Sequence, residues 1–118
     1  MNLYHYAATV LHVVDGDTVD LLVSLGFDTT FTGRFRLIGI NTPESYGPDA
    51  CDAGRAAKAW LTDLLKVDTR VIVKTHKDKK EKYGRYLAEV YLADDATKTV
   101  NQMLIEAGHA VAYDGGKR

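Results

Sequence analysis

The order of the strand and helix patterns is the feature that most constrains the fold of this chain. Runs of β-branched and apolar residues predict five short strands, at residues 6–14, 19–25, 34–40, 70–75 and 85–92. Between the third and fourth strands, apolar residues in the range 53–64 recur at helical spacing. A second helix is expected after Thr99, where residues 99–102 fit a capping box and Gly108 fits a helix end. The order β-β-β-α-β-β-α is that of an OB-fold, so we predict an α+β fold built on a five-stranded barrel.

Length and composition are those of one globular domain. The 118 residues allow a single domain, residues 1–118, with a polar tail from about Gly115. Cys51 is the sole cysteine, which excludes an internal disulfide. A net charge of −1 argues against a general nucleic-acid coat protein, which is usually basic. The first residues lack a secretory signal pattern, so we expect a cytoplasmic protein and leave open secretion or release on lysis. We also expect a monomer.

An acidic turn, Asp15-Gly16-Asp17, follows the first predicted strand. Asp15 suits the turn itself, whereas Asp17 is a candidate ligand for a hard cation; the alternative is that both residues only build the hairpin. An EF-hand is excluded, because the sixth position counted from Asp15 is Asp20 and the twelfth is Gly26. A calcium site would therefore have to combine distant segments.

Arg36 lies in an otherwise apolar strand. A guanidinium loses several kcal/mol on desolvation unless it meets an anion, which indicates either a phosphate or a buried ion pair, for instance with Glu44. Strand alternation would place Arg36 and Asn41 on opposite faces, so we expect a bend or bulge near Gly39.

Asn41 and Thr42 close that strand. Pro43 forces Thr42 into an extended conformation that leaves its carbonyl free to point away from the sheet, and amide and carbonyl oxygens are acceptable calcium ligands. The alternative is an ordinary Asx-turn at the strand end.

A basic stretch precedes the fifth predicted strand. From Lys74 to Arg85 there are six lysines and arginines against two acidic residues. Arg85 offers a bidentate fork, Lys82 a point charge, and Tyr83 a hydroxyl or a stacking face. The alternative is a solvated hairpin turn with ordinary surface charges.

Taken together, these motifs resemble the staphylococcal nuclease family, from about His12 to Tyr113. The shared stretches are Val-Asp-Gly-Asp-Thr, Phe-Arg-Leu-Ile-Gly-Ile-Asn-Thr-Pro-Glu, Tyr-Gly-Pro-Asp-Ala and Lys-Tyr-Gly-Arg, in family order. The resemblance implies an OB-fold nuclease that hydrolyses DNA and RNA with Ca²⁺ and leaves 3′-phosphate ends. It implies calcium ligands Asp17, Asn41 and Thr42, catalytic residues Arg36, Glu44 and Arg85, and substrate-binding residues Lys82, Tyr83 and Tyr113.

Three departures from the family pattern affect this interpretation. Asn41 replaces a metal-binding aspartate, which removes a negative charge and predicts weaker calcium binding. The loop between Glu44 and Tyr46 is short where the staphylococcal enzyme has an insertion. The chain stops at Arg118 where that enzyme continues into a third helix, so we predict a barrel lacking the family's C-terminal helix.

We therefore expect a calcium-dependent phosphodiesterase acting on DNA or RNA, preferentially single-stranded. The main alternative is a non-catalytic nucleic-acid-binding OB module, which Asn41 favours. A domain that mediates only protein contacts is a third hypothesis, and it leaves Arg36 unexplained.

Overall fold

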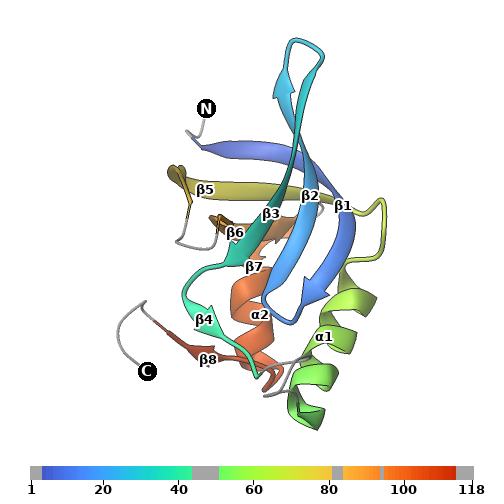
Figure 1. Cartoon of the computed structure of the whole chain (residues 1–118), viewed down its shortest axis with the longest axis vertical. Helices are drawn as coiled ribbons and strands as arrows, with labels where there is room; N and C mark the ends of the chain where they lie inside the picture. Colours follow the sequence, from blue (N-terminus) through green and yellow to red (C-terminus); the bar gives the residue numbers. More distant parts are fainter. Residues whose placement is uncertain (1–3, 44–50, 81–83, 94, 114–118) are drawn as a thin grey trace.

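The computed structural model describes residues 4–43, 51–80, 84–93 and 95–113, without the side chains of 77–80, 95 and 96. Its elements, in order, are β1 (His5–Asp15), β2 (Thr18–Gly26), β3 (Thr29–Leu37), β4 (Ile40–Asn41), α1 (Asp52–Leu64), β5 (Arg70–Lys80), β6 (Tyr86–Leu92), β7 (Asp95–Thr99), α2 (Val100–Glu106) and β8 (Val111–Ala112) (Figure 1). The five predicted strands and two predicted helices are confirmed. The short strands β4, β7 and β8 were not predicted.

Five strands form a closed barrel. The main sheet has the order β3-β2-β1-β5-β6-β7, and a further pairing between β3 and β6 closes it. That closing pair is parallel and joins Phe35 to Tyr86, Arg36 to Leu87 and Leu37 to Ala88. The predicted OB-fold barrel is confirmed. The strands β4 and β8 pair separately as a two-stranded sheet.

The core fills the barrel and continues under both helices. Strand residues that alternate inward, such as Val10, Leu21 and Val73, are fully buried. From the helices, Leu61 of α1 and Leu104 of α2 join the same cluster. Both helices lie toward one end of the barrel, α1 against β1 and α2 against β6 (Figure 1). Neither of these helices is long and apolar enough to cross a membrane.

The β2–β3 hairpin is longer than the sequence indicated. The predicted strands 19–25 and 34–40 leave residues 26–33 as a connection, and this is wrong: β3 begins at Thr29, and the turn consists of Phe27 and Asp28. The threonines at the start of β3 are polar but β-branched, so they favour a strand. Phe27 and Asp28 both have positive φ angles, 54° and 60°, as a tight hairpin turn requires. The hairpin projects beyond the barrel at the top of Figure 1.

The bend predicted near Gly39 is confirmed. Strand β3 ends at Leu37, Gly39 has a φ of 80°, and β4 begins at Ile40. The predicted third strand therefore ends earlier than expected. Because a residue with a side chain is strained at such a φ, glycine suits the turn that redirects the chain between Arg36 and Asn41.

Two further boundaries differ from the sequence prediction or refine it. Strand β5 extends to Lys80, so the first part of the basic stretch is strand rather than loop. At the start of α2, the Thr99 side chain accepts a hydrogen bond from the Gln102 amide at 3.0 Å. The Gln102 side chain donates instead to Glu106, at 3.4 Å, which is one helical turn further along.

Candidate functional site

The β1–β2 turn packs Gly16, the residue before Asp17, against Thr42. A Cβ atom added at Gly16 would lie 3.0 Å from the Ala57 Cβ and 3.1 Å from the Thr42 Oγ1. Since glycine has no Cβ, the turn can pack against α1 and the segment that follows β4. Asp15 has the expected turn role, because its Oδ1 accepts a hydrogen bond from the Gly16 amide at 2.8 Å. Asp17, the residue after Gly16, is itself buried, as is Thr42.

Arg36 is a buried arginine whose charge is met by Asp17. The distance from Arg36 Nη2 to Asp17 Oδ2 is 3.4 Å. The guanidinium also donates to the carbonyl oxygens of Leu37 at 2.6 Å and Ile40 at 3.2 Å. These carbonyls flank the Gly39 turn, so the bend provides the acceptors that fix the orientation of the guanidinium.

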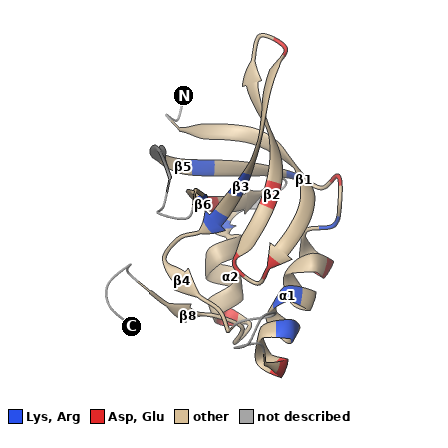
Figure 2. Cartoon of the chain, in the orientation of Figure 1, with Lys and Arg blue, Asp and Glu red and all other residues tan. Residues whose placement is uncertain are grey.

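Thr18 links this ion pair to the second arginine. Its hydroxyl donates to Asp17 Oδ1 at 3.0 Å and accepts from Arg85 Nη1 at 3.3 Å. The two arginines, distant in sequence, therefore meet at one Asp-Thr pair. Sequence reasoning missed Thr18 as a site residue; the available signal was its position directly after Asp17. In Figure 2 the basic residues of β3 lie above the acidic β1–β2 turn.

The predicted metal ligands Asn41 and Thr42 lie at the end of β4. Asn41 is half-buried and pairs with Val111 of β8, while Thr42 is buried. Tyr113 follows β8, and its amide donates to the Gly39 carbonyl at 2.9 Å, which places its backbone beside the same turn.

The structure thus brings together Asp17, Arg36 and Arg85. Thr42 lies against Gly16, the residue before Asp17, and Asn41 precedes Thr42 in the chain. Three predicted site residues, Glu44, Lys82 and Tyr83, lie outside the described residues.

By chemical type, the donor atoms of the three predicted ligands suit a hard cation. Asp17 supplies a carboxylate, Asn41 an amide oxygen and Thr42 a carbonyl, all of them oxygen ligands of the kind that Ca²⁺ takes. Within the part of the chain that is described, no three His, Cys, Asp or Glu side chains gather at a potential metal site. The Asp17 charge is also shared with Arg36. The residues therefore fit a calcium ion in type, with little negative charge to attract it.

Asn101 forms hydrogen bonds to β6 and to the turn that follows β3. It is buried on α2, and its amide nitrogen donates to the carbonyls of Ile38 at 2.8 Å and Ala88 at 3.2 Å. Its Oδ1 accepts from the Val90 amide at 3.2 Å. One side chain thus connects α2, β6 and the turn after Arg36. The sequence indicated this residue only as part of a helix start.

Fold and site together define a class of protein. It is an OB-fold domain in which two arginines converge on an Asp-Thr pair near the β3–β6 pairing that closes the barrel, an arrangement suited to phosphate groups. The family model described as "Staphylococcal nuclease homologue" matches residues 34–118. The chain belongs to the staphylococcal nuclease family, as the sequence motifs predicted.

Similar proteins carry nuclease names. The chain is 34% identical, over 107 residues, to a protein of Escherichia coli O157:H7 named "Uncharacterized endonuclease", covering 89% of this chain and 60% of the relative. It is 31% identical to Endonuclease YhcR of Bacillus subtilis, over 92% of this chain and 9% of the relative. It is 38% identical to the Thermonuclease of Staphylococcus intermedius, over 73% of this chain and 49% of the relative. The chain thus spans at most about three fifths of these relatives' lengths.

Proposed function

We propose that this protein is a nuclease that hydrolyses phosphodiester bonds in DNA or RNA, preferentially in single strands. The observation that carries the proposal is the convergence of Arg36 and Arg85 on the Asp17–Thr18 pair. Two guanidinium groups at one position suit a phosphodiester, whose non-bridging oxygens each accept hydrogen bonds. The nuclease names of relatives support the same function.

The two arginines have different roles in this proposal. Arg36 is buried and oriented by two carbonyls and Asp17, so it offers a preorganised positive charge. Arg85 is only half-buried and donates a hydrogen bond to the Thr18 hydroxyl at 3.3 Å. It is therefore the arginine better placed to bind the incoming phosphate and to stabilise the charge that develops during cleavage.

We further propose Ca²⁺ as the cofactor, held by Asp17, Asn41 and the Thr42 carbonyl. When bound, the ion would supply neutralisation of charge on the phosphate oxygens. With Asn41 in place of a carboxylate, the protein's own ligands provide one negative charge, and substrate phosphate completes the site. Glu44 is the proposed residue that activates or orients water, and 3′-phosphate ends are the proposed products.

The experiment is cleavage of single-stranded DNA with millimolar Ca²⁺, with Mg²⁺, and with a chelator. Arg85→Lys is the test variant, and Arg34→Lys is its control, because Arg34 is exposed and paired with Asp20 at 2.9 Å. We expect calcium-dependent cleavage that falls by about 100-fold or more in Arg85→Lys and by less than twofold in Arg34→Lys. Turnover of Arg85→Lys within a few-fold of the original protein would contradict the assigned role.

A non-catalytic binding module is the second candidate function, and the single carboxylate among the three proposed metal ligands favours it. In that case the domain would bind single-stranded DNA in a salt-sensitive manner and cleave it under none of the three conditions.

A further inference from the structure

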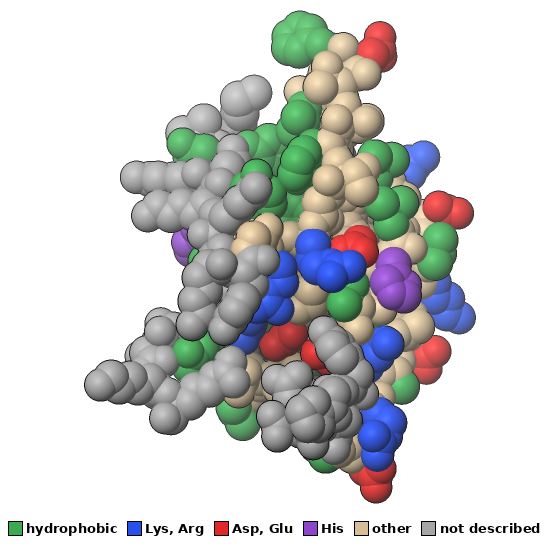
Figure 3. Space-filling model, in the orientation of Figure 1, with side chains coloured by type: hydrophobic (Ala, Val, Ile, Leu, Met, Phe, Trp, Pro, Cys, Tyr) green, Lys and Arg blue, Asp and Glu red, His purple; other side chains and the backbone are tan. Residues whose placement is uncertain are grey.

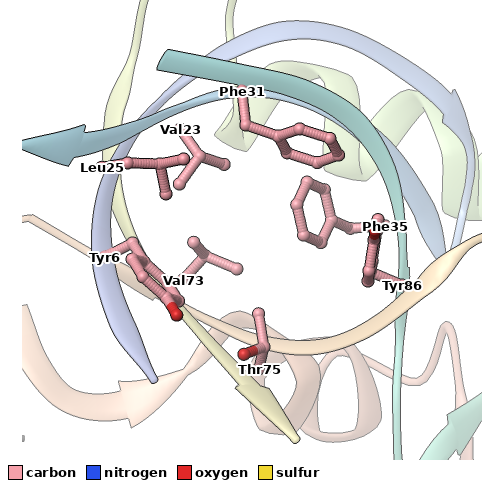
Figure 4. Close-up of a pocket in the computed structure, with 8 residues that line it drawn as sticks. All are labelled: Tyr6, Val23, Leu25, Phe31, Phe35, Val73, Thr75 and Tyr86. Atoms are coloured by element: carbon pink, nitrogen blue, oxygen red, sulfur yellow. The ribbon is translucent and has the colours of Figure 1, made fainter. Parts of the chain in front are cut away.

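A cavity of about 200 Å³ opens at the hairpin end of the barrel (Figure 4). Three aromatic rings form one side of it. The Phe31 ring meets the Tyr86 ring edge-on with centroids 5.5 Å apart, and the Phe35 ring lies 5.8 Å from that of Tyr86. On the opposite side, Figure 4 shows the hydroxyl oxygens of Tyr6 and Thr75. The cavity is therefore mainly aromatic and apolar, and the hydroxyl groups of Tyr6, Thr75 and Tyr86 are its polar side-chain groups.

The cavity opens where the barrel wall ends. The closing pairs between β3 and β6 begin at Phe35 and Tyr86, and the earlier residues of β3 pair with β2. Arg34 and Arg85 directly precede these two aromatic residues. Because neighbouring side chains of a strand point to opposite faces, β3 carries the Phe35 ring on the inside and Arg34 on the outside. Arg85 comes directly before Tyr86, the first residue of β6. The ring of Tyr86 in the aromatic cavity therefore belongs to the residue next to Arg85 in the chain.

The rim of the cavity leaves apolar side chains accessible. Leu25 is 45% exposed and Phe31 is 36% exposed. The Phe31 ring lies over Gly33, where an added Cβ would be 2.4 Å from the ring carbon Cε2. The absence of a side chain at Gly33 is thus what allows the ring to fold across the cavity. On the face drawn in Figure 3, hydrophobic side chains lie above basic ones.

We propose that this cavity is a subsite for one nucleobase of the bound strand, a proposal that rests on the proposed nuclease function. Its volume is below the roughly 300–1,000 Å³ of pockets for larger ligands, which suits a single flat ring system. Aromatic side chains beside a basic groove bind bases by stacking, with little dependence on sequence. A phosphate bound at Arg85 leaves a neighbouring base at the edge of the cavity, beside the Tyr86 ring.

The test uses short single-stranded DNA with one 2-aminopurine, whose fluorescence is quenched by stacking, and a matched DNA with an abasic site there. Both are titrated at low salt with chelator, which prevents metal-dependent cleavage. Phe31→Leu is the test variant. Phe27→Leu is the control, because it removes an exposed phenylalanine from the tip of the same hairpin, outside the cavity lining.

We expect quenching with the original protein. We also expect binding of the base-containing DNA to be about tenfold weaker in Phe31→Leu, with no change for the abasic DNA or in Phe27→Leu. Leu25→Thr, at the exposed rim, provides a second variant if Phe31→Leu does not fold.

Two results would overturn the proposal. If Phe31→Leu and Leu25→Thr bind both DNAs as the original does, without quenching, while Arg85→Lys loses salt-sensitive binding, the base subsite is wrong and the nuclease function stands. If the original protein binds neither DNA and also cleaves no single-stranded DNA with Ca²⁺, both proposals are contradicted.

Discussion

Replacing Asn101 by alanine tests whether one buried amide holds the arginine-bearing strands together. The substitution removes three hydrogen bonds, to Ile38, Ala88 and Val90. The Ala88 carbonyl keeps a second partner, the Ile38 amide at 2.9 Å. The Val90 amide and the Ile38 carbonyl each lose the bond to Asn101. A buried donor without its partner costs about 1–3 kcal/mol, and a partly buried carbonyl about 0.5–1.5 kcal/mol. The expected loss in free energy of unfolding is therefore about 2–4 kcal/mol.

Urea unfolding followed by the fluorescence of Trp60 measures this loss. Trp60 is the single tryptophan and packs against the core near the His109 ring, at 5.7 Å. With a typical urea dependence, the midpoint should fall by about 1–2 M. Gln102→Ala is the matched control, since this exposed neighbour on the same helix should change the free energy by less than about 0.5 kcal/mol. An Asn101→Ala protein within about 0.5 kcal/mol of the original would refute the reasoning.

Three other expectations concern the same fold. Arg36→Met should destabilise by about 3–5 kcal/mol because it leaves Asp17 buried without its cation, and Asp17→Asn in the same chain should recover part of the loss in a double-mutant cycle. Gly16→Ala should cost about 1–3 kcal/mol in urea unfolding, since the added Cβ overpacks the turn; an unchanged midpoint would contradict this. A hydrogen bond from Lys98 lowers the pKa of Glu106 from its ordinary value of 4.5. The Lys98–Glu106 pair therefore contributes to the free energy of unfolding above pH 4.5, and this contribution is lost as the pH falls through the lowered pKa. Glu106→Gln should therefore show a smaller loss of stability in acid, measured as the urea midpoint against pH.

Local patterns in the sequence were enough to predict the main elements and three local structural features. The Asp-Gly-Asp-Thr turn, the bend at Gly39 and the need of Arg36 for an anion all follow from neighbouring residues or from the chemistry of one side chain. These predictions succeeded because their causes, turn geometry and desolvation, act over a few residues.

The remaining features depend on contacts that no local pattern encodes. Thr18 joins Asp17 to Arg85 only because β3 and β6 close the barrel. Asn101 also has a local role at a helix start, which hides its long-range bonds. The start of β3 was missed for a different reason: threonine is typical of both polar connections and strands.

The short closing pair of β3 and β6 also has a consequence for how the protein folds. It joins segments far apart in the chain, so the loop entropy of bringing them together must be overcome before the pair is stable. Arg36 and Arg85 lie at that closure, and their convergence exists only when it has formed. During refolding, phosphate binding should therefore appear together with protection of the Ile38 amide, which donates to Ala88 across the closing strands, from exchange with solvent. Under the proposed function, phosphate binding would therefore report that this long-range pair has formed.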